Sequence, residues 1–228
     1  MTTVRRSADF KKNFYEHEAW LLNQRVCGID EVGRGCLAGP VVAGAVMLHS
    51  GKKSRLIKDS KELTPEERLR AYEWIIRNGS CAVGIVHHRL IDQKNIYQAT
   101  LIAMKRSLMQ LFAGSSQRPL YILVDSMPLK IDFLDTDIVA FPYGESKSIS
   151  IAAASIIAKV TRDRIIERLG QVFPGYDLDK HKGYCTAQHR EKLQELESSI
   201  IHRTTFIDHY DNAANPLHER DYDQATIW

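Results

Sequence analysis

The chain has 228 residues, of which 44% are hydrophobic and 26% are charged, values typical of one globular domain with ample material for a core. The formal net charge is only +3, so total charge identifies no class of partner. The sequence has no N-terminal apolar signal region and no run of eighteen apolar residues, which argues against secretion and membrane spanning. We therefore expect a cytoplasmic protein.

The distribution of charge divides the chain. Residues 51–61 form a basic loop, in which five Lys or Arg residues stand against the single acid Asp59. The last 22 residues are acidic. A basic loop in the body of a protein is compatible with nucleic-acid binding, although solvated surfaces also look like this. We expect an N-terminal helical extension at 1–24, a catalytic domain at 25–206 that includes a C-terminal helical segment, and an acidic extension at 207–228.

Hydrophobic patterning predicts a mixed order of strands and helices. Strands are expected at about 25–31 and 40–48, as an antiparallel pair around a glycine-rich turn, and at 80–88. A strand buried on both faces is expected at 120–124 and an edge strand at 138–141. A helix opens at Thr64, where Pro65 and Glu67 complete a capping box. Further helices are expected before the first strand and at 89–94, 95–112, 151–169 and 186–196.

Two adjacent carboxylates, Asp30 and Glu31, end the first apolar run and precede Gly33-Arg34-Gly35. Neighbouring side chains of a strand point to opposite faces, so a working pair must lie where the strand ends or twists. The alternative is a hairpin turn with solvated charges at its mouth. The glycine spacing G-x-G-x-x-x-G leads into a strand, which excludes a dinucleotide-binding turn.

Two more carboxylates lie at the ends of other elements. Asp125 ends the buried strand, where open α/β sheets place ligand sites, although a turn-forming Asp before Pro128 is an alternative. Glu145 precedes the long helix, whose N-terminal dipole would tolerate anions such as substrate phosphates. Hard divalent cations prefer several oxygen ligands, and two such ions can activate a water on a phosphodiester. Since the sequence lacks serine-hydrolase and zinc-protease motifs, these acids favour a metal-dependent phosphoryl-transfer enzyme.

Several strings, all in order, closely resemble the signature of ribonuclease HII, the type 2 ribonuclease H. They are GIDEVGRG at 28–35, LAGPVV at 37–42, DSK at 59–61, VD at 124–125, SKSISIAAASIIAKVTRDR at 146–164, FPGY at 173–176, HKGY at 181–184 and His202-Arg203-x-x-Phe206. The resemblance covers about residues 25–206.

The resemblance implies an α/β fold of the ribonuclease H type. That fold has a mixed five-stranded sheet, three antiparallel strands followed by two parallel ones, flanked by helices. Members of the family cut the RNA strand of RNA–DNA hybrids and nick duplex DNA on the 5′ side of a lone ribonucleotide. They leave a 3′-hydroxyl and a 5′-phosphate, and they use two divalent ions, Mg²⁺ or Mn²⁺.

The resemblance also implies a metal-binding and catalytic set. Asp30, Glu31 and Asp125 match three of the family's four carboxylates. Glu145 stands where the family usually has Asp, and in this it is similar to the sister family, ribonuclease HIII. The Gly33-Arg34-Gly35 turn has the ribonuclease HII form. Ser126 also departs from the family pattern, since Gly usually follows the third carboxylate.

Substrate-binding residues follow from the same resemblance. In the family, the Gly33-Arg34-Gly35 turn reads the ribose 2′-hydroxyl. The tyrosine that matches Tyr184 stacks on the sugar of the following deoxynucleotide, and the lysine that matches Lys61 contacts a phosphate. Taken alone, Tyr184 would be a loop aromatic packed on the body and Lys61 a solvated charge.

The leading hypothesis is a cytoplasmic, monomeric endoribonuclease that acts on RNA–DNA hybrids and on duplex DNA containing ribonucleotides, with no membrane partner. One alternative is an enzyme with ribonuclease HIII-like preference for longer hybrids. The other is a non-catalytic hybrid-binding protein, against which the presence of all the carboxylates argues.

Overall fold

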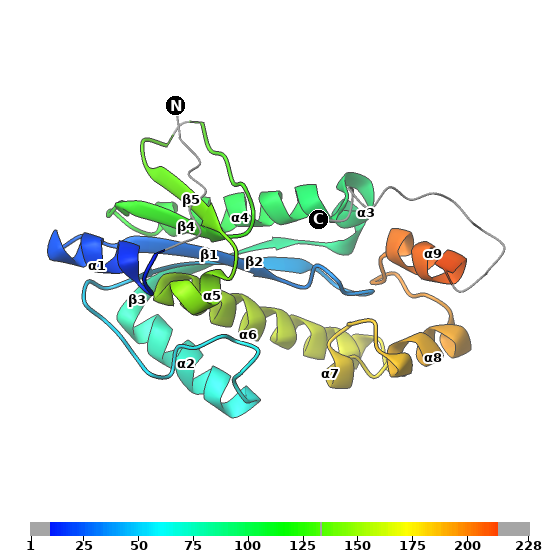
Figure 1. Ribbon diagram of the computed structural model, residues 1–228. Helices are drawn as coiled ribbons and strands as arrows, with labels where there is room; N and C mark the ends of the chain where they lie inside the picture. The colour runs from blue at the N-terminus through cyan, green and yellow to red at the C-terminus, as the bar shows by residue number, and fades with distance from the viewer. Residues whose placement is uncertain (1–9, 133, 214–228) are drawn as a thin grey trace.

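A computed structural model describes residues 10–132 and 134–213, with side chains described as far as residue 208. One five-stranded sheet, in the order β3-β2-β1-β4-β5, runs through the middle of the molecule (Figure 1). Its strands are β1 (Val26–Val32), β2 (Val41–Leu48), β3 (Gly79–Val86), β4 (Tyr121–Asp125) and β5 (Asp137–Phe141). β1, β2 and β3 are antiparallel neighbours, whereas β4 and β5 run parallel to β1. The predicted mixed sheet is confirmed.

Helices cover both faces of the sheet. They are α1 (Phe14–Leu21), α2 (Pro65–Asn78), α3 (His88–Lys94), α4 (Ile96–Ala113), α5 (Gly144–Lys147), α6 (Ile149–Val172), α7 (Leu178–His181), α8 (Ala187–Leu196) and α9 (Thr204–Ala213). α4 packs on one face, and α6, backed by α2, packs on the other (Figure 1). Strand alternation divides the side chains between two apolar clusters: Ile29 faces α4, for example, whereas Val46 faces α6.

α6 lies against the sheet at backbone-to-backbone contact. A methyl group at Gly28 of β1 would overlap the backbone of Ser150, and one at Gly44 of β2 would overlap the carbonyl of Ala154. α6 also has small, buried alanines such as Ala153, which is fully buried, on the side that packs against the sheet. The small residues on both partners therefore set how near the helix comes to the strand that carries Asp30.

Capping residues explain where the helices begin. The predicted capping box of α2 is confirmed, because Thr64 Oγ1 accepts a hydrogen bond from the Glu67 amide at 3.2 Å and Glu67 Oε2 accepts one from the Thr64 amide at 3.0 Å. α6 begins at Ile149 and ends at Val172, beyond the predicted 151–169 at both ends. The four-residue helices α5 and α7 were not expected, since so short a segment has no hydrophobic period.

The C-terminal helices α7, α8 and α9 gather at one end of the molecule (Figure 1). α9 runs through residue 206, where the sequence places the end of the catalytic domain, so that boundary falls inside a helix. Residues 1–9 of the N-terminal extension and 214–228 of the acidic extension lie outside the described residues. Among the described helices, none combines the length and the apolar character that crossing a bilayer requires.

We predict that Gly28→Ala destabilises the protein by about 3 kcal/mol, because the added methyl group forces α6 away from β1. Gly114→Ala is the matched control, since a methyl group there meets its nearest atom at an ordinary 3.7 Å. Urea denaturation of both variants measures the free energy of unfolding. Equal values for the two variants would contradict the close packing of α6.

Candidate active site

The sheet brings the predicted carboxylates to one edge. β1 and β4 are parallel neighbours in a register that pairs Ile29 with Val124, so Asp30 and Asp125 follow side by side towards the ends of the two strands. Glu145 comes from α5, directly after β5. Burial, followed by the charges of Glu31, Asp125 and Glu145, raises the pKa of Asp30 well above its usual value. The other three carboxylates therefore lie within electrostatic reach of Asp30.

Asp30 points towards α6 and is almost completely buried, with 5% of its surface exposed. Its Oδ1 accepts a hydrogen bond from the Glu31 amide at 2.8 Å, and the Ser155 hydroxyl of α6 lowers its pKa against the effect of burial. Ser155 Oγ lies 2.8 Å from Ser60 Oγ in the basic loop. The alternative of solvated charges at a hairpin mouth is thus wrong for Asp30.

Glu31 points to the opposite face of β1 from Asp30, as strand alternation requires. Arg34 Nη1 donates to its Oε1 at 3.4 Å, whereas its Oε2 is buried and has no hydrogen-bond partner among the described residues. Burial raises the pKa of Glu31 to about 7, with Arg34 acting in the opposite direction and the charge of Asp125 adding to the rise. A buried carboxylate oxygen without a donor is a position where a cation would be stabilising.

Asp125 joins two segments of the chain instead of shaping only a local turn. Its Oδ1 accepts a hydrogen bond from the Gly144 amide at 3.0 Å, which ties the end of β4 to the start of α5. Ser126 has a φ of 57°, in the left-handed region that glycine adopts most easily. Glycine would therefore suit this position. The Ser126 hydroxyl donates to Asp125 Oδ1 at 3.2 Å and is exposed, so this side chain contacts the carboxylate from the solvent side.

Glu145 is tied to the basic loop. Its Oε2 accepts a hydrogen bond from the Ser60 amide at 2.8 Å, and its Oε1 lies 3.7 Å from Lys61 Nζ. Burial raises the pKa of Glu145, and the Ser60 amide opposes that rise. The Lys61 side chain is 85% exposed, so its charge is solvated, as the alternative interpretation holds. It nevertheless lies beside the carboxylates, because it pairs with Glu145.

Two buried arginines support the Gly33-Arg34-Gly35 turn and the segments beside it. Arg203 donates to the carbonyls of Gly33, Arg34 and Gly39 at 2.6–3.1 Å, and Arg162 donates to the carbonyls of Pro40, Ala38 and Lys182 at 2.9–3.1 Å. Both side chains have 0% exposure, and burial lowers the pKa of Arg203 to about 10. Sequence reasoning assigned neither residue this role.

Tyr184 lies beside the same turn. An isolated β-bridge joins it to Cys36, one residue after the turn. Its half-buried ring lies 5.1 Å from Lys159 Nζ and 5.4 Å from the Arg162 guanidinium carbon. Burial raises the pKa of its phenol to about 12. Lys159 in turn pairs with Asp163 at 3.0 Å.

The donor set fits a hard divalent cation. Among the side chains described, those of residues 10–132 and 134–208, no group of three or more His, Cys, Asp or Glu is arranged to hold an ion by itself. Magnesium, however, keeps several waters and needs only one or two carboxylates together with phosphate oxygens of a substrate. The unpartnered Glu31 Oε2 and the raised pKa values of Asp30, Glu31 and Glu145 indicate buried carboxylates whose charge the protein compensates only in part.

Comparison with known proteins agrees with this architecture. The chain matches the family model of ribonuclease HII over residues 27–209. It is 43% identical over 193 residues to the ribonuclease HII of Levilactobacillus brevis, covering 84% of this chain and 72% of that protein. The crystal structure of ribonuclease H2 from Pyrococcus horikoshii superposes with a TM-score of 0.65 at 28% identity, over 79% of this chain and 93% of that one.

A second solved structure is similar to the same extent. The ribonuclease HII of the PCNA complex from Archaeoglobus fulgidus gives a TM-score of 0.65 at 26% identity, over 88% of this chain and 98% of that one. Fold and relatives together define the chain as a nuclease of the ribonuclease H class, an endonucleolytic hydrolase. The chain belongs to the ribonuclease HII family, whose members are endoribonucleases acting on RNA–DNA hybrids.

The raised pKa values predict how stability without divalent ions depends on pH. Since Glu31 binds its proton more tightly in the folded state, its contribution is fully present below the unfolded pKa of about 4.5 and is lost as pH rises through about 7. In EDTA, the wild type should lose up to about 3 kcal/mol more than Glu31→Gln between pH 5 and pH 8. Urea denaturation at several pH values measures this difference. Identical pH slopes for the two proteins would contradict the raised pKa.

Proposed function

We propose that this chain is a Mg²⁺- or Mn²⁺-dependent endoribonuclease that nicks duplex DNA on the 5′ side of a single embedded ribonucleotide and cuts the RNA strand of hybrids. The products carry a 3′-hydroxyl and a 5′-phosphate. The observation that carries the proposal is the convergence of Asp30, Glu31, Asp125 and Glu145 at one sheet edge, with raised pKa values for three of them and an unpartnered oxygen on Glu31.

The four carboxylates would hold two ions, which when bound supply an activated water and stabilise the leaving oxygen. The chain itself prepares their ligands. Arg34 fixes one oxygen of Glu31 and leaves the other free, while the Gly144 amide orients Asp125. The Ser60 amide orients Glu145 in the same way. Each of these three carboxylates is therefore oriented by a hydrogen bond from within the protein.

The substrate would be read by the Gly33-Arg34-Gly35 turn and by Tyr184. Arg203 fixes the carbonyls of Gly33 and Arg34, and the partly exposed Arg34 side chain and the amides of the turn would contact a ribose 2′-hydroxyl. A methyl group at Gly35 would meet no atom within 4 Å, so the space above the turn is open to a substrate. Tyr184 would stack on the next sugar, and Lys61 would contact a phosphate.

Single-ribonucleotide cleavage is proposed over a ribonuclease HIII-like preference because the match to the ribonuclease HII family covers the Gly33-Arg34-Gly35 turn. Glu145, which is similar to the ribonuclease HIII pattern, uses its length here to reach the Ser60 amide.

We further propose that the enzyme acts as a monomer in the cytoplasm. Among the described cysteines, all four are free thiols, which suits a reducing compartment.

The test is a labelled DNA duplex with one ribonucleotide, incubated with Mg²⁺, Mn²⁺ or EDTA. We expect a single nick on the 5′ side of the ribonucleotide with a metal, none with EDTA, and at least about a hundredfold loss in Asp125→Asn. Asparagine keeps an oxygen to accept the Gly144 hydrogen bond but loses the charge that would hold an ion. Asp132→Asn, a change of an exposed aspartate seven residues further along the chain, is the control.

Cutting of long hybrids without the nick would favour the ribonuclease HIII-like alternative. Binding of hybrid without any cutting would favour the non-catalytic alternative.

Tyr184 provides a separate prediction. Tyr184→Ala should slow cleavage at an RNA-to-DNA junction about tenfold more than cleavage within an all-RNA strand, because stacking on the following deoxyribose is lost. Tyr184→Phe keeps the ring over Lys159 and Arg162 and should retain the junction preference. The ratio of kcat/KM values on the two substrates measures the effect. An equal loss on both substrates would remove the stacking role.

A further inference from the structure

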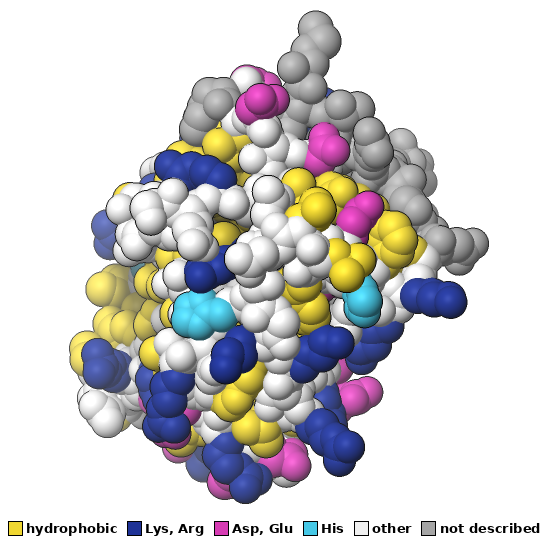
Figure 2. All heavy atoms as spheres, turned by 90° about the vertical axis from the view of Figure 1, so that its left-hand side faces the viewer, with side chains coloured by type: hydrophobic (Ala, Val, Ile, Leu, Met, Phe, Trp, Pro, Cys, Tyr) yellow, Lys and Arg dark blue, Asp and Glu magenta, His cyan; other side chains and the backbone are white. Residues whose placement is uncertain are grey.

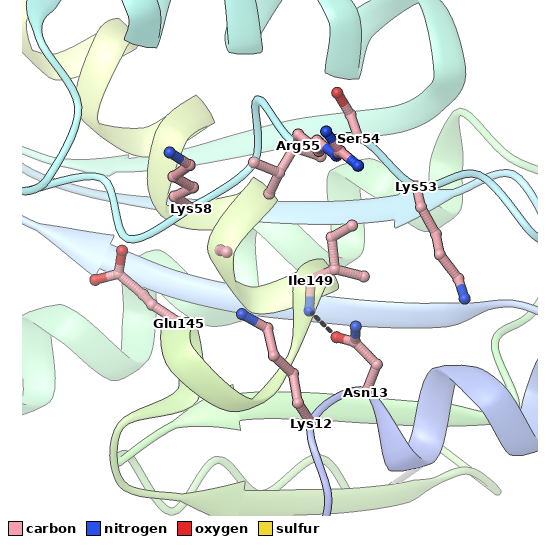
Figure 3. Close-up of a pocket in the computed structure, with 10 residues that line it drawn as sticks. Lys12, Asn13, Lys53, Ser54, Arg55, Lys58, Glu145 and Ile149 are labelled. Carbon is pink, nitrogen blue, oxygen red and sulfur yellow. Dashed lines mark hydrogen bonds between the residues drawn. The ribbon is translucent and has the colours of Figure 1, made fainter.

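A basic groove of about 520 Å³ opens beside Glu145 (Figure 3). Its walls come from the segment before α1, from the basic loop between β2 and α2, and from the first turns of α6. We call it the basic groove, and define it by Lys12, Asn13, Lys53, Ser54, Arg55, Ile57, Lys58, Glu145, Ile149 and Ala152. Figure 3 shows Lys58 above Glu145 and Lys12 to its lower right, with Lys53 at the far end of the groove.

The groove has four cations and only one acid. Lys12, Arg55 and Lys58 are exposed, and among the described side chains none of them makes an ion pair. Lys53 Nζ lies 5.3 Å from the Trp20 ring centroid and also lacks an acidic partner in the described part of the chain. Lys and Arg side chains gather on the lower half of the face seen in Figure 2, on the side of α2 and the basic loop. The positive charge is therefore available to an anionic ligand.

The cations, and not the helix terminus, would attract the ligand. At the start of α6, Asn13 Oδ1 accepts from the Ile149 amide at 2.8 Å, and Glu16 Oε1 accepts from the Ser150 amide at 3.1 Å. Ser148 Oγ accepts from the Ile151 amide at 3.1 Å. With these amides satisfied within the protein, none of the three is left to donate to a substrate phosphate. Long, flexible cations on several segments suit a phosphate chain better than one enclosed phosphate.

One face of α6 connects the groove with the proposed active site. Ile149, Ala152, Ser155, Lys159 and Arg162 are spaced by three or four residues and so share a helix face. The first two line the groove, Ser155 adjoins Asp30, and the last two lie under Tyr184. With a rise of about 1.5 Å per residue, the groove extends from about 4.5 Å (at Ala152) to about 9 Å (at Ile149) from Ser155 along the helix, on the side away from Tyr184. At about 3.4 Å per nucleotide this range is about one to three nucleotides.

We propose that the basic groove binds backbone phosphates of the substrate, about one to three nucleotides to the 5′ side of the ribonucleotide. The inference rests on the proposed function, which places the nucleotide after the ribonucleotide at Tyr184 and thereby the 5′ strand at the groove. Lys12 makes the segment before α1 part of the substrate-binding surface, together with Lys53, Arg55 and Lys58 of the basic loop.

The test compares Lys12→Ala/Lys53→Ala/Arg55→Ala with the charge-matched control Lys94→Ala/Lys105→Ala/Lys130→Ala. The substituted side chains lie on the surface, so both variants should unfold at the wild-type temperature. On a duplex with about ten nucleotides on each side of the ribonucleotide, we expect the groove variant to raise KM about tenfold. The slope of log KM against log salt should fall by about 2 to 3, roughly one unit for each phosphate that is no longer neutralised. The control variant should change neither.

Substrates with shortened flanks locate the bound phosphates. Trimming the 5′ side to one nucleotide should remove most of the difference between the groove variant and the wild type, whereas trimming the 3′ side to the same length should preserve it. A groove variant that matches the control on the long duplex, or a difference that disappears on 3′ trimming, would overturn the inference. Failure of the wild type to nick the duplex with either metal would instead refute the proposed function.

Discussion

The close contact between α6 and the centre of the sheet is the constraint on which the site depends. Gly28 and Gly44 have no side chains, and the facing turns of α6 are rich in alanine, so two backbones meet directly. This packing brings the Ser155 hydroxyl of α6 next to Asp30 of β1. It also places the first turns of α6 beside Glu145. A helix held one side chain further from the sheet would leave Asp30 without that partner.

Concentrated negative charge is the consequence of this packing. Four carboxylates meet at one sheet edge, and burial together with mutual repulsion raises the pKa values of Asp30 and Glu31. The protein offsets only part of that charge, through Arg34, Lys61 and the amides of Ser60 and Gly144. The divalent cations of the proposed function would offset the remaining imbalance. The proposed activity would thus use an electrostatic cost that the fold imposes.

Positive charge has two separate uses in the molecule. Arg162 and Arg203 are completely buried and serve backbone carbonyls around the glycine turn, so they give the turn its shape and leave its outer surface open. The cations of the basic groove lie at the surface and, within the described residues, form no ion pairs. The buried pair positions the part of the protein that would read the ribose, and the groove cations would hold the strand to its 5′ side.

The order of strands and helices, the α2 capping box and the identity of the candidate carboxylates could all be read from the sequence. Periodicity, caps and glycine spacing are local properties, and the ordered motifs around Asp30 and Asp125 are dense enough to identify a family. Only the tertiary structure decided what Arg162 and Arg203 do, because their partners lie more than a hundred residues away for most of these hydrogen bonds. The same holds for the groove between Lys12 and Arg55 and for the reach of Glu145 to Ser60. Contacts between distant segments depend on how the helices pack on the sheet, which no local pattern records.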